Sequence, residues 1–366
     1  MNYSRRQFVK CTGCLLAAGT AHAVLPMSGS GLYEAGYYKK LDDKIIECQL
    51  CPRRCQTRDG ERGFCGVRVN QTGVYYTLVY GKTAASHIDP IEKKPLFHML
   101  PGSAALSIAT VGCNVMCRFC QNWELSQSLP KDVEMHEFPP DRVAALAKQR
   151  HCPIIAYTYN EPIVFTEYMY DTAQAARTMN LHNVMISNGY INKQPMKDLC
   201  GVLDAVKIDL KAFNQRFYRE LVSGELNPVL DTLVLIKSLG MWTEIVYLVI
   251  PGENDNTDEL KQMSQWIYRE LGPETPLHFS RFYPQYRMQN LPPTPVAMLK
   301  KARNIALDAG LHYVYIGNVP GDPGENTYCP ECGKMLIKRT GFFVGAVKLD
   351  HGKCRYCGAA IAGIWS

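Results

Sequence analysis

The chain has 366 residues, of which 46% are hydrophobic and 20% are charged. This balance is typical of a globular protein with two or three folding units. The net charge is +6, and three of the positive charges, Arg5, Arg6 and Lys10, lie at the extreme N-terminus. The remaining surplus is too small to indicate nucleic-acid binding, and no apolar run reaches the ~20 residues that a membrane-spanning helix needs.

The N-terminus resembles an export signal. The run S-R-R-Q-F-V-K at residues 4–10 resembles a twin-arginine motif, a modest apolar stretch follows, and Ala21-His22-Ala23 is an A-x-A cleavage site. We predict that residues 1–23 are a twin-arginine signal for a periplasmic or exported protein. The alternative is a cytoplasmic protein that keeps its N-terminus. Residues 24–44 hold three glycines and are predicted to be a linker.

The 15 cysteines are grouped in a way that indicates metal ligands more than disulfides. Two of them, Cys152 and Cys200, stand alone beside apolar residues, and we expect them to be core thiols. Eleven others form three sets, which are Cys48, Cys51, Cys55 and Cys65, then Cys113, Cys117 and Cys120, then Cys329, Cys332, Cys354 and Cys357.

The central set has the spacing C-x3-C-x2-C, which suits three thiolates around one cubic [4Fe-4S] cluster. Such clusters are usually held by four cysteines, and the nearest downstream cysteine, Cys152, is 32 residues away. A three-cysteine site leaves one iron without a protein ligand, so that iron can bind and activate a small molecule. The alternative is a zinc knuckle or buried thiols, although a knuckle normally needs a fourth ligand nearby.

The region around this set predicts an α/β fold. Strands and helices alternate from residue 105 to about 318, which predicts a parallel sheet with helices outside it. The predicted strands are 105–111, 153–159, 182–187, 204–210, 243–250, 277–282 and 311–317. The predicted helices are 140–150, 163–179, 194–202, 227–239, 257–271 and 295–309. Six such units fit a partial (β/α)6 barrel, whose active site lies at the strands' C-terminal ends. A doubly wound sheet would give a similar pattern.

Two smaller cysteine-bearing modules flank this unit. Residues 45–104 carry the first set as C-x2-C-x3-C-x9-C, which predicts a second metal centre. Zinc would only fix the fold there, whereas a second iron–sulfur cluster could pass electrons to the first. Residues 325–366 carry two C-x2-C knuckles, as in zinc ribbons. Zinc is the expected metal there, a single iron has the same tetrahedral geometry, and paired disulfides are the alternative in an exported protein.

The three-cysteine motif, with an aromatic residue before its last cysteine, resembles the radical S-adenosylmethionine (SAM) superfamily. The resemblance implies a partial barrel over residues 105–324 with a [4Fe-4S] cluster and SAM as cofactors. It further implies reductive cleavage of SAM to a 5′-deoxyadenosyl radical, which removes hydrogen from a substrate. The sequence does not identify that substrate.

A narrower resemblance covers nearly the whole chain after the signal. The run Q-N-W-E at 121–124, the run Y-T-Y-N-E-P at 157–162 and both flanking modules resemble the radical SAM component of the AmmeMemoRadiSam system. That family is related to pyruvate formate-lyase activating enzymes. Its implied partners are Memo-type and AMMECR-type proteins, and the chemistry implies a low-potential donor of the flavodoxin or ferredoxin type.

The resemblance also implies which strand ends hold SAM. Asn160 and Glu161 stand where the superfamily has a Gly-Gly-Glu-Pro motif, whose Glu contacts the SAM amine. Tyr159 and Asn160 replace the two glycines, and a Glu that only stabilises a helix N-terminus is the alternative. Ser187 and Asn188 resemble the Thr-Asn-Gly of glycyl-radical-enzyme activases and could bond the ribose hydroxyls, although a plain turn would read the same.

Two further groups complete the predicted SAM site. Asp209 and Lys211 face the same side of a strand and resemble the Asp-x-Lys motif that binds the SAM ribose and carboxylate, with a structural ion pair as the alternative. Phe119, Val249 and Ile250 are expected to pack on the adenine. A different class of protein, an exported electron carrier with several metal centres and a vestigial SAM site, also fits the cysteine sets.

Overall fold

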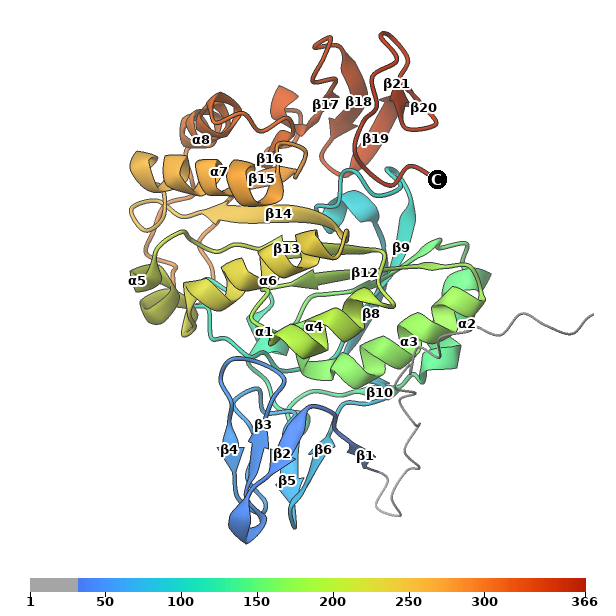
Figure 1. Cartoon of the computed structure of the whole chain (residues 1–366), viewed down its shortest axis with the longest axis vertical. Coiled ribbons are helices and arrows are strands. Elements are labelled where there is room, and N and C mark those ends of the chain that lie inside the picture. The colour runs from blue at the N-terminus through green and yellow to red at the C-terminus, as the bar shows by residue number, and fades with distance from the viewer. Residues whose placement is uncertain (1–31) are drawn as a thin grey trace, which may run out of the picture.

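The structure is a computed structural model that describes residues 32–366, so the predicted signal and the first part of the predicted linker lie outside the described residues. A central α/β unit separates two small β-rich modules. Figure 1 shows the N-terminal module in blue at the bottom and the C-terminal module in red at the top. No helix between residues 32 and 366 is long and apolar enough to cross a membrane.

The central unit is an eight-stranded sheet in the order β16-β15-β14-β13-β12-β11-β9-β8. Its seven parallel strands follow one another in chain order, and β8 pairs antiparallel with β9. A doubly wound sheet would reverse its strand order at a switch point, so the observed order excludes that alternative. The strands are β8 (Ala85–Pro90), β9 (Ala104–Ala109), β11 (Ile154–Tyr157), β12 (His182–Ser187), β13 (Ala205–Asp209), β14 (Trp242–Val249), β15 (Leu277–Arg281) and β16 (Val314–Gly317).

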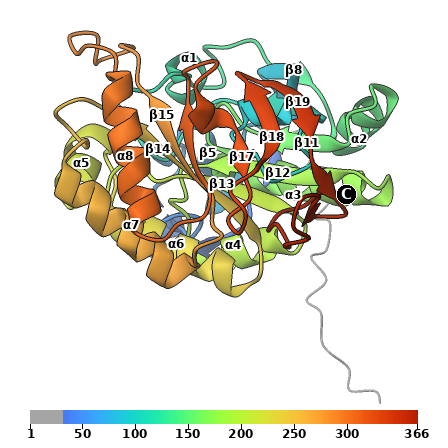
Figure 2. The same cartoon turned by 90° about the horizontal axis from the view of Figure 1, so that it is seen from above.

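Six helices connect these strands, each where the sequence predicts one. They lie around the outside of the curved sheet, as Figure 2 shows for α6, α7 and α8. Amphipathic spacing explains their placement: α7 buries Leu260, Met263 and Ile267 at intervals of three and four residues. The helices are α2 (Pro140–Gln149), α3 (Thr166–Thr178), α4 (Lys193–Cys200), α6 (Leu226–Ser238), α7 (Thr257–Leu271) and α8 (Val296–Asp308).

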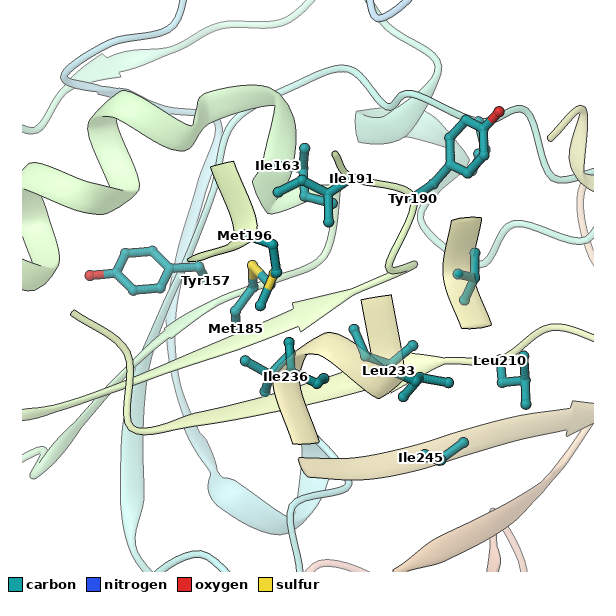
Figure 3. Packing of buried hydrophobic residues seen from close by; sticks show 14 of the residues in the cluster. Tyr157, Ile163, Met185, Tyr190, Ile191, Met196, Leu210, Leu233, Ile236 and Ile245 are labelled. Carbon is teal, nitrogen blue, oxygen red and sulfur yellow. The ribbon is translucent and has the colours of Figure 1, made fainter. Parts of the chain in front are cut away.

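The main apolar core lies between the sheet and these helices. Figure 3 shows Leu233 and Ile236 of α6 close to Ile245 of β14. Side chains alternate along a strand, so the neighbours of these core residues point to the inner face of the sheet. That inner face carries the polar residues of the site described below.

Several short elements were not predicted. They are β7 (Lys82–Thr83), α1 (Trp123–Ser126), β10 (His136–Glu137), η3 (Pro162–Phe165), α5 (Gln215–Phe217) and a π-helix, η4 (Tyr218–Val222). The π-helix matters to the site because the carbonyls of Leu221 and Val222 accept the backbone N–H groups of Arg118 and Met116 at 2.9 and 2.8 Å. It therefore holds the cysteine loop from outside the sheet.

The N-terminal module begins earlier than predicted. Its strands are β1 (Tyr33–Glu34), β2 (Tyr38–Lys40), β3 (Ile46–Cys48), β4 (Gln56–Thr57), β5 (Arg68–Gln71) and β6 (Val74–Thr77). The linker prediction is therefore wrong from residue 33 onward. Tyrosines anchor this segment: Tyr33 stacks on Tyr80 with ring centroids 3.6 Å apart, and the Tyr37 hydroxyl donates to Asp198 at 2.8 Å. The predicted module also ends too late, because β8 belongs to the central sheet.

A buried ion pair attaches the N-terminal module to the central unit. The Nη2 atom of Arg68 donates to both carboxylate oxygens of Glu167 on α3, at 2.9 and 2.6 Å, and its Nη1 atom donates to the Gly36 carbonyl at 3.2 Å. The Arg68 side chain is 1% exposed. Removing one partner of such a buried pair costs about 3–5 kcal/mol because the other charge stays uncompensated.

The C-terminal module docks at the opposite end of the sheet. Its strands are β17 (Thr327–Tyr328), β18 (Met335–Thr340), β19 (Phe343–Val347), β20 (Leu349–Asp350) and β21 (Lys353–Cys354). The buried Arg339 donates to the Phe97 carbonyl at 2.7 Å and to Thr327 Oγ1 at 2.8 Å, and its guanidinium lies 4.1 Å from the centre of the Phe97 ring. Phe97 therefore joins this module to the sheet through both its carbonyl and its ring.

His98 lies beside this contact and is neutral in the folded protein. Its Nδ1 atom lies 2.6 Å from the Ala362 carbonyl oxygen, and its Nε2 atom lies 2.6 Å from the Tyr315 hydroxyl. A carbonyl oxygen can only accept, so Nδ1 carries the proton and Nε2 accepts from Tyr315. Burial lowers the pKa of His98 to about 4.

Acid should therefore loosen the C-terminal module. The unfolded chain protonates His98 near pH 6.5, whereas the folded protein resists protonation until about pH 4. Stability should fall as the pH drops through this interval. Denaturant unfolding at pH 7 and pH 5 measures the loss, and His98→Gln should lose less stability between the two pH values than the wild type. His351→Gln, at a histidine whose side chain is 95% exposed, should keep the wild-type difference. An equal difference in all three proteins would contradict the prediction.

Candidate active site

The cysteine loop follows β9 and is fixed by close packing against the N-terminal module. Gly112 has a φ of +87°, and a Cβ atom there would lie 2.5 Å from the Cys65 carbonyl oxygen and 2.8 Å from Val67. Only glycine meets both the conformation and the space. The loop that carries Cys113 therefore lies directly against the module that carries the first cysteine set.

The three loop cysteines line a cavity of about 400 Å³ at the carboxyl ends of the parallel strands. This is the location that the sequence predicts. The other predicted residues that line the cavity are Phe119, Asn160, Glu161, Ser187, Asn188, Asp209 and Lys211. The structure thus brings together residues that are nearly 100 positions apart in the chain.

Asn160 holds the loop as well as lining the cavity. Its Oδ1 atom accepts from the Thr110 backbone N–H at 3.2 Å, and its Nδ2 atom donates to Thr110 Oγ1 at 3.1 Å and to the Gly112 carbonyl at 3.0 Å. Both ends of the amide are therefore engaged by the segment just before Cys113. This side chain positions the cysteine loop relative to the end of β11.

Glu161 is a buried carboxylate whose hydrogen-bond donors are all neutral. Its oxygens accept from the Ile163 N–H at 3.2 Å, from Ser187 Oγ at 2.7 Å and from the Asn188 N–H at 2.8 Å. The first bond caps η3, so the helix-terminus role is present together with the cavity position. Burial raises the pKa of Glu161 to about 7 despite these donors. A cationic ligand would stabilise its charged form.

Ser187 and Asn188 at the end of β12 connect Glu161 to the cysteine loop. Besides holding Glu161, Asn188 directs its Nδ2 atom to the Asn114 side-chain oxygen at 2.9 Å and toward the sulfur of Cys113 at 3.8 Å. Both residues are buried. A plain turn does not explain these bonds, because the two side chains join three strand ends into one wall of the cavity.

Asp209 lies between two lysines, one of which was not predicted. Its carboxylate accepts from Lys211 Nζ at 3.1 Å and from Lys207 Nζ. Burial alone would raise the pKa of Asp209, but the two ammonium groups lower it to about 2. Lys207, Asp209 and Lys211 share one face of β13 because they are two residues apart. That parity was visible in the sequence and could have identified Lys207.

The predicted adenine contacts are partly wrong. Phe119 lines the cavity, but Val249 and Ile250 do not, because both are fully buried in the core behind the sheet. On β14 the alternating pattern places Val246 and Leu248 in the cavity instead. Val246 stands opposite Asp209 in the strand register, and Leu248 stands opposite Ser280. Val249 has the opposite parity to these two residues, and Ile250 lies beyond the end of β14, so the strand's alternation does not direct it to the cavity.

A second charged cluster closes the other side of the cavity. Lys94 is buried and donates to Asp89 at 2.6 Å, while its ammonium lies 4.4 Å from the centre of the Tyr159 ring. Burial lowers the pKa of Lys94 to about 8. Tyr159 takes up a φ of +68° and its hydroxyl also bonds Asp89. No sequence motif marks Asp89 and Lys94, which come from β8 and the segment after it, whereas Tyr159 belongs to the run Y-T-Y-N-E-P.

The charges and donors of this cavity fit a [4Fe-4S] cluster with SAM. Three thiols and no fourth suit a cluster with one open iron. Glu161, with only neutral donors, suits an ammonium group. Lys207 and Lys211 share one carboxylate, so a positive charge stays unbalanced there and suits the carboxylate of an amino acid.

The four C-terminal cysteines form a separate and tighter group. Their sulfur atoms all lie within 4.8 Å of one another, with Cys329 and Cys357 3.6 Å apart and Cys332 and Cys354 3.8 Å apart. These distances exceed a disulfide bond of about 2.05 Å, and all thirteen described cysteines are free. They match the edges of a tetrahedron with metal–sulfur bonds of ~2.3 Å.

Comparison with known proteins agrees with this site. Residues 107–264 match the family model of the radical SAM superfamily. The chain is 49% identical over 330 residues to an uncharacterized protein, MJ0808, of Methanocaldococcus jannaschii, covering 90% of this chain and 98% of the relative. MJ0674 of the same organism is 25% identical over 258 residues, covering 67% of this chain and 68% of the relative.

Solved structures resemble the chain at lower identity. A domain of a pyruvate-formate lyase-activating enzyme from Bacteroides vulgatus has a TM-score of 0.41 and 13% identity, covering 44% of this chain and 98% of that one. A radical SAM methyltransferase from Sphaerobacter thermophilus has a TM-score of 0.48 and 14% identity, covering 62% of this chain and 70% of that one.

The α/β fold with the three-cysteine loop is therefore that of the radical SAM class of proteins. Residues 107–264 of the chain are a domain of the radical SAM superfamily. That family uses a [4Fe-4S] cluster and SAM, and the residues that line the cavity here are the ones available to hold them.

Asp209→Asn should weaken SAM binding while leaving the iron content unchanged. The substitution keeps the shape but removes the charge that orders Lys207 and Lys211. We expect affinity to fall roughly 10- to 150-fold, which corresponds to one charge-assisted contact of about 1.5–3 kcal/mol. Equilibrium binding to the reconstituted protein measures the change. Asp231→Asn, at an exposed position of α6, should bind SAM like the wild type. Unchanged affinity in Asp209→Asn would assign the Lys–Asp–Lys group to structure alone.

Proposed function

We propose that this protein cleaves SAM reductively and uses the resulting radical to remove hydrogen from a substrate. The observation that carries the proposal is the cavity itself, in which three thiols lie between a buried carboxylate and a pair of lysines. These three groups are complementary to an iron cluster, an ammonium group and a carboxylate. An electron carrier has no need for the last two.

The protein's part in this chemistry is to hold and orient. When bound, the cluster supplies one electron that breaks the sulfur–carbon bond of SAM and leaves methionine and a 5′-deoxyadenosyl radical. Cys113, Cys117 and Cys120 hold the cluster, Glu161 holds the amine, and Lys207 and Lys211 hold the carboxylate. Asp209 is placed to accept a ribose hydroxyl, and Phe119, Val246 and Leu248 offer an apolar wall that excludes water.

The residues at the cavity mouth favour a substrate that enters beside the C-terminal module. Phe342, at the turn between β18 and β19, lines the cavity although it belongs to that module, and the next residue, Phe343, is 72% exposed. A rim of exposed aromatic residues suits a peptide or another partially apolar partner. This agrees with either a glycyl-radical activase type or the AmmeMemoRadiSam type of enzyme.

The partners are proposed from the family resemblance, and the location is proposed from the N-terminal sequence. Memo-type and AMMECR-type proteins are the proposed partners, a flavodoxin or ferredoxin type of donor supplies electrons, and nucleic acid is not expected. Export through the twin-arginine route is proposed from residues 1–23. That route carries folded proteins with their cofactors, which agrees with an iron–sulfur protein.

Replacing all three loop cysteines by alanine should abolish SAM cleavage. The reconstituted wild-type protein, reduced anaerobically with dithionite, should form 5′-deoxyadenosine and methionine in equal amounts, measured by chromatography. The triple variant should form neither. A matched control, Cys152→Ala with Cys200→Ala, removes two thiols outside the three sets and should keep the activity.

The same experiment distinguishes the proposed enzyme from the alternative, an electron carrier. A wild-type protein that is reduced and reoxidised reversibly but forms no 5′-deoxyadenosine would indicate an electron carrier with a vestigial SAM site. A triple variant that still forms 5′-deoxyadenosine would overturn the assignment of the loop cysteines.

We further propose that the C-terminal tetrad binds one zinc ion. Gly333 and Gly358 follow the two knuckles with φ values of +67° and +80°. Their N–H groups bond back to the carbonyls of Cys329 and Cys354 at 3.0 and 2.9 Å. These tight turns bring both ligand pairs together, so the metal would fasten β18 and β21 to each other.

Cys332→Ser with Cys357→Ser should remove one zinc per chain and destabilise the C-terminal module, because assembly of such a site is coupled to local folding. Elemental analysis of the purified full chain measures the metal, and limited proteolysis after residue 325 measures the local loss of order. Ser366→Ala provides a control in the same module. One iron in place of zinc would change the metal but not the site, whereas no metal at the tetrad in the wild type would end the proposal.

A further inference from the structure

The first cysteine set surrounds a second cavity, separate from the one that holds the loop cysteines. Cys48, Cys51, Cys55 and Cys65 all line this cavity. Three of these cysteines come from the segment at and after β3, and the fourth lies shortly before β5. The remaining wall is formed by side chains and backbone of this module and of the central unit.

The spacing of these sulfur atoms differs from that of a single-metal site. Within residues 32–366, the C-terminal tetrad is the only group of three or more such ligands whose donor atoms all lie within 4.8 Å of one another. A zinc tetrahedron has sulfur–sulfur edges of ~3.8 Å, given bonds of ~2.3 Å. A [4Fe-4S] cube places four irons between its thiolates and so holds them further apart. Like the sulfur atoms of the loop cysteines, those of the first set are spaced more widely than those of the C-terminal tetrad.

A buried hydroxyl without a partner lies in the wall of this cavity. Tyr75 is 0% exposed, and its hydroxyl oxygen has no hydrogen-bond partner among the described residues. Gly63 leaves room for it, since a Cβ atom there would lie 2.5 Å from that oxygen. An unpaired buried hydroxyl costs about 1–3 kcal/mol, so its position is explained by an acceptor that occupies the cavity. The sulfides of a cluster are such acceptors.

The cavity also supplies N–H donors and positive charge. The Phe64 backbone N–H donates to the sulfur of Cys55 at 3.4 Å. The backbone N–H groups of Leu50, Arg53 and Val67 are oriented so that they lower the pKa of the Cys48, Cys51 and Cys65 thiols against the effect of burial. Each of these three N–H groups lies two residues after its cysteine, as Val115 does after the loop ligand Cys113. Hydrogen bonds of this kind stabilise thiolates bound to metal.

Two arginines lie at the same wall. Arg53 lies 3.4 Å from the centre of the Phe64 ring, and Arg68 is buried behind the cysteines. Arg68 is already paired with Glu167, so Arg53 is the arginine whose charge offsets the negative charge of the thiolates, which would otherwise be costly to bury.

We propose that Cys48, Cys51, Cys55 and Cys65 bind a second [4Fe-4S] cluster, with the Tyr75 hydroxyl donating to one of its sulfides, and that this cluster passes electrons to the first. The site does not depend on the cleavage of SAM, because it is built entirely from residues outside the first cavity, apart from the shared loop.

The loop between the two cavities carries the connection. Cys113 lines the first cavity, and its neighbour Asn114 lines the second. The Asn114 side chain also accepts a hydrogen bond from Asn188, which lines the first cavity. The Arg53 side chain also bonds the Asn114 carbonyl. One peptide unit therefore separates the two sites along the chain.

The electron step balances without a proton. A low-potential donor of the flavodoxin or ferredoxin class gives one electron to the second cluster, whose oxidised 2+ state becomes 1+. That electron then moves to the first cluster, and the second returns to 2+. Phe64 is 41% exposed beside Cys55, so the second site reaches the surface where a donor can approach.

Counting iron and acid-labile sulfide in the full chain tests the proposal. After anaerobic reconstitution, the wild type should contain about eight irons and eight sulfides per chain. The triple variant Cys113→Ala, Cys117→Ala, Cys120→Ala should keep about four of each, with a reducible paramagnetic signal that SAM does not change. Cys51→Ala with Cys65→Ala should also keep about four, with a signal that SAM does change. Cys152→Ala with Cys200→Ala should match the wild type.

Two spectroscopic measurements test the details. Tyr75→Phe should keep the iron content but lower the midpoint potential of the second cluster, because the more negative reduced state loses a donor. The fully reduced wild type should show magnetic interaction between two clusters, absent from both cysteine variants. An unchanged potential would remove Tyr75 from the site, and two signals without interaction would overturn the electron path.

The iron count also decides against the proposal where it fails. About four irons in the wild type, none of them left in the triple loop variant, would show that the first set holds no cluster. Two zinc ions per chain with that result would make it a single-metal site. If the Cys51–Cys65 variant does not fold, the iron counts of the triple loop variant and the wild type still test the second cluster. A wild type that contains about eight irons but does not cleave SAM would contradict the proposed function and leave this inference standing.

Discussion

The site of this protein depends on one constraint, which is that seven parallel strands end at the same edge of one sheet. Their consecutive order places the loop after β9, the end of β11, the end of β12 and the end of β13 side by side. Cys113, Glu161, Asn188 and Asp209 become neighbours for that reason alone. Because side chains alternate along each strand, the inner face can carry charged groups while the outer face packs against the helices.

The electrostatics of the cavity follow from its burial. Burial raises the pKa of Glu161 because it disfavours the charged carboxylate. The pKa of Asp209 is lowered because two lysine ammonium groups lie beside it. The two carboxyl groups therefore prefer opposite ligands: one needs a cation to become charged, and the other already belongs to a cationic cluster. An amino acid that carries both an ammonium and a carboxylate satisfies both groups at once.

The flanking modules are parts of the site and not separate attachments. The N-terminal module presses Cys65 against Gly112 and is fixed by the Arg68–Glu167 pair, so it sets the position of the cysteine loop. The C-terminal module is fixed through Arg339 and Phe97 at the sheet and contributes Phe342 to the cavity mouth. Each module brings its own four cysteines, and their different sulfur spacings suit different metals.

The sequence by itself determined the three cysteine sets, the alternation of strands and helices, and the polar strand ends, because spacing and periodicity are local properties. It was wrong about residues 33–44, where Tyr33 and Tyr37 contact Tyr80 and Asp198, more than forty positions away. Only the tertiary structure showed that Val246 and Leu248 face the cavity, whereas Val249 and Ile250 are buried in the core at and just beyond the end of β14. It also revealed the buried position of Lys94 and the unpaired hydroxyl of Tyr75. No local pattern marks these residues, because their roles come from burial beside groups that the chain brings together only when it folds.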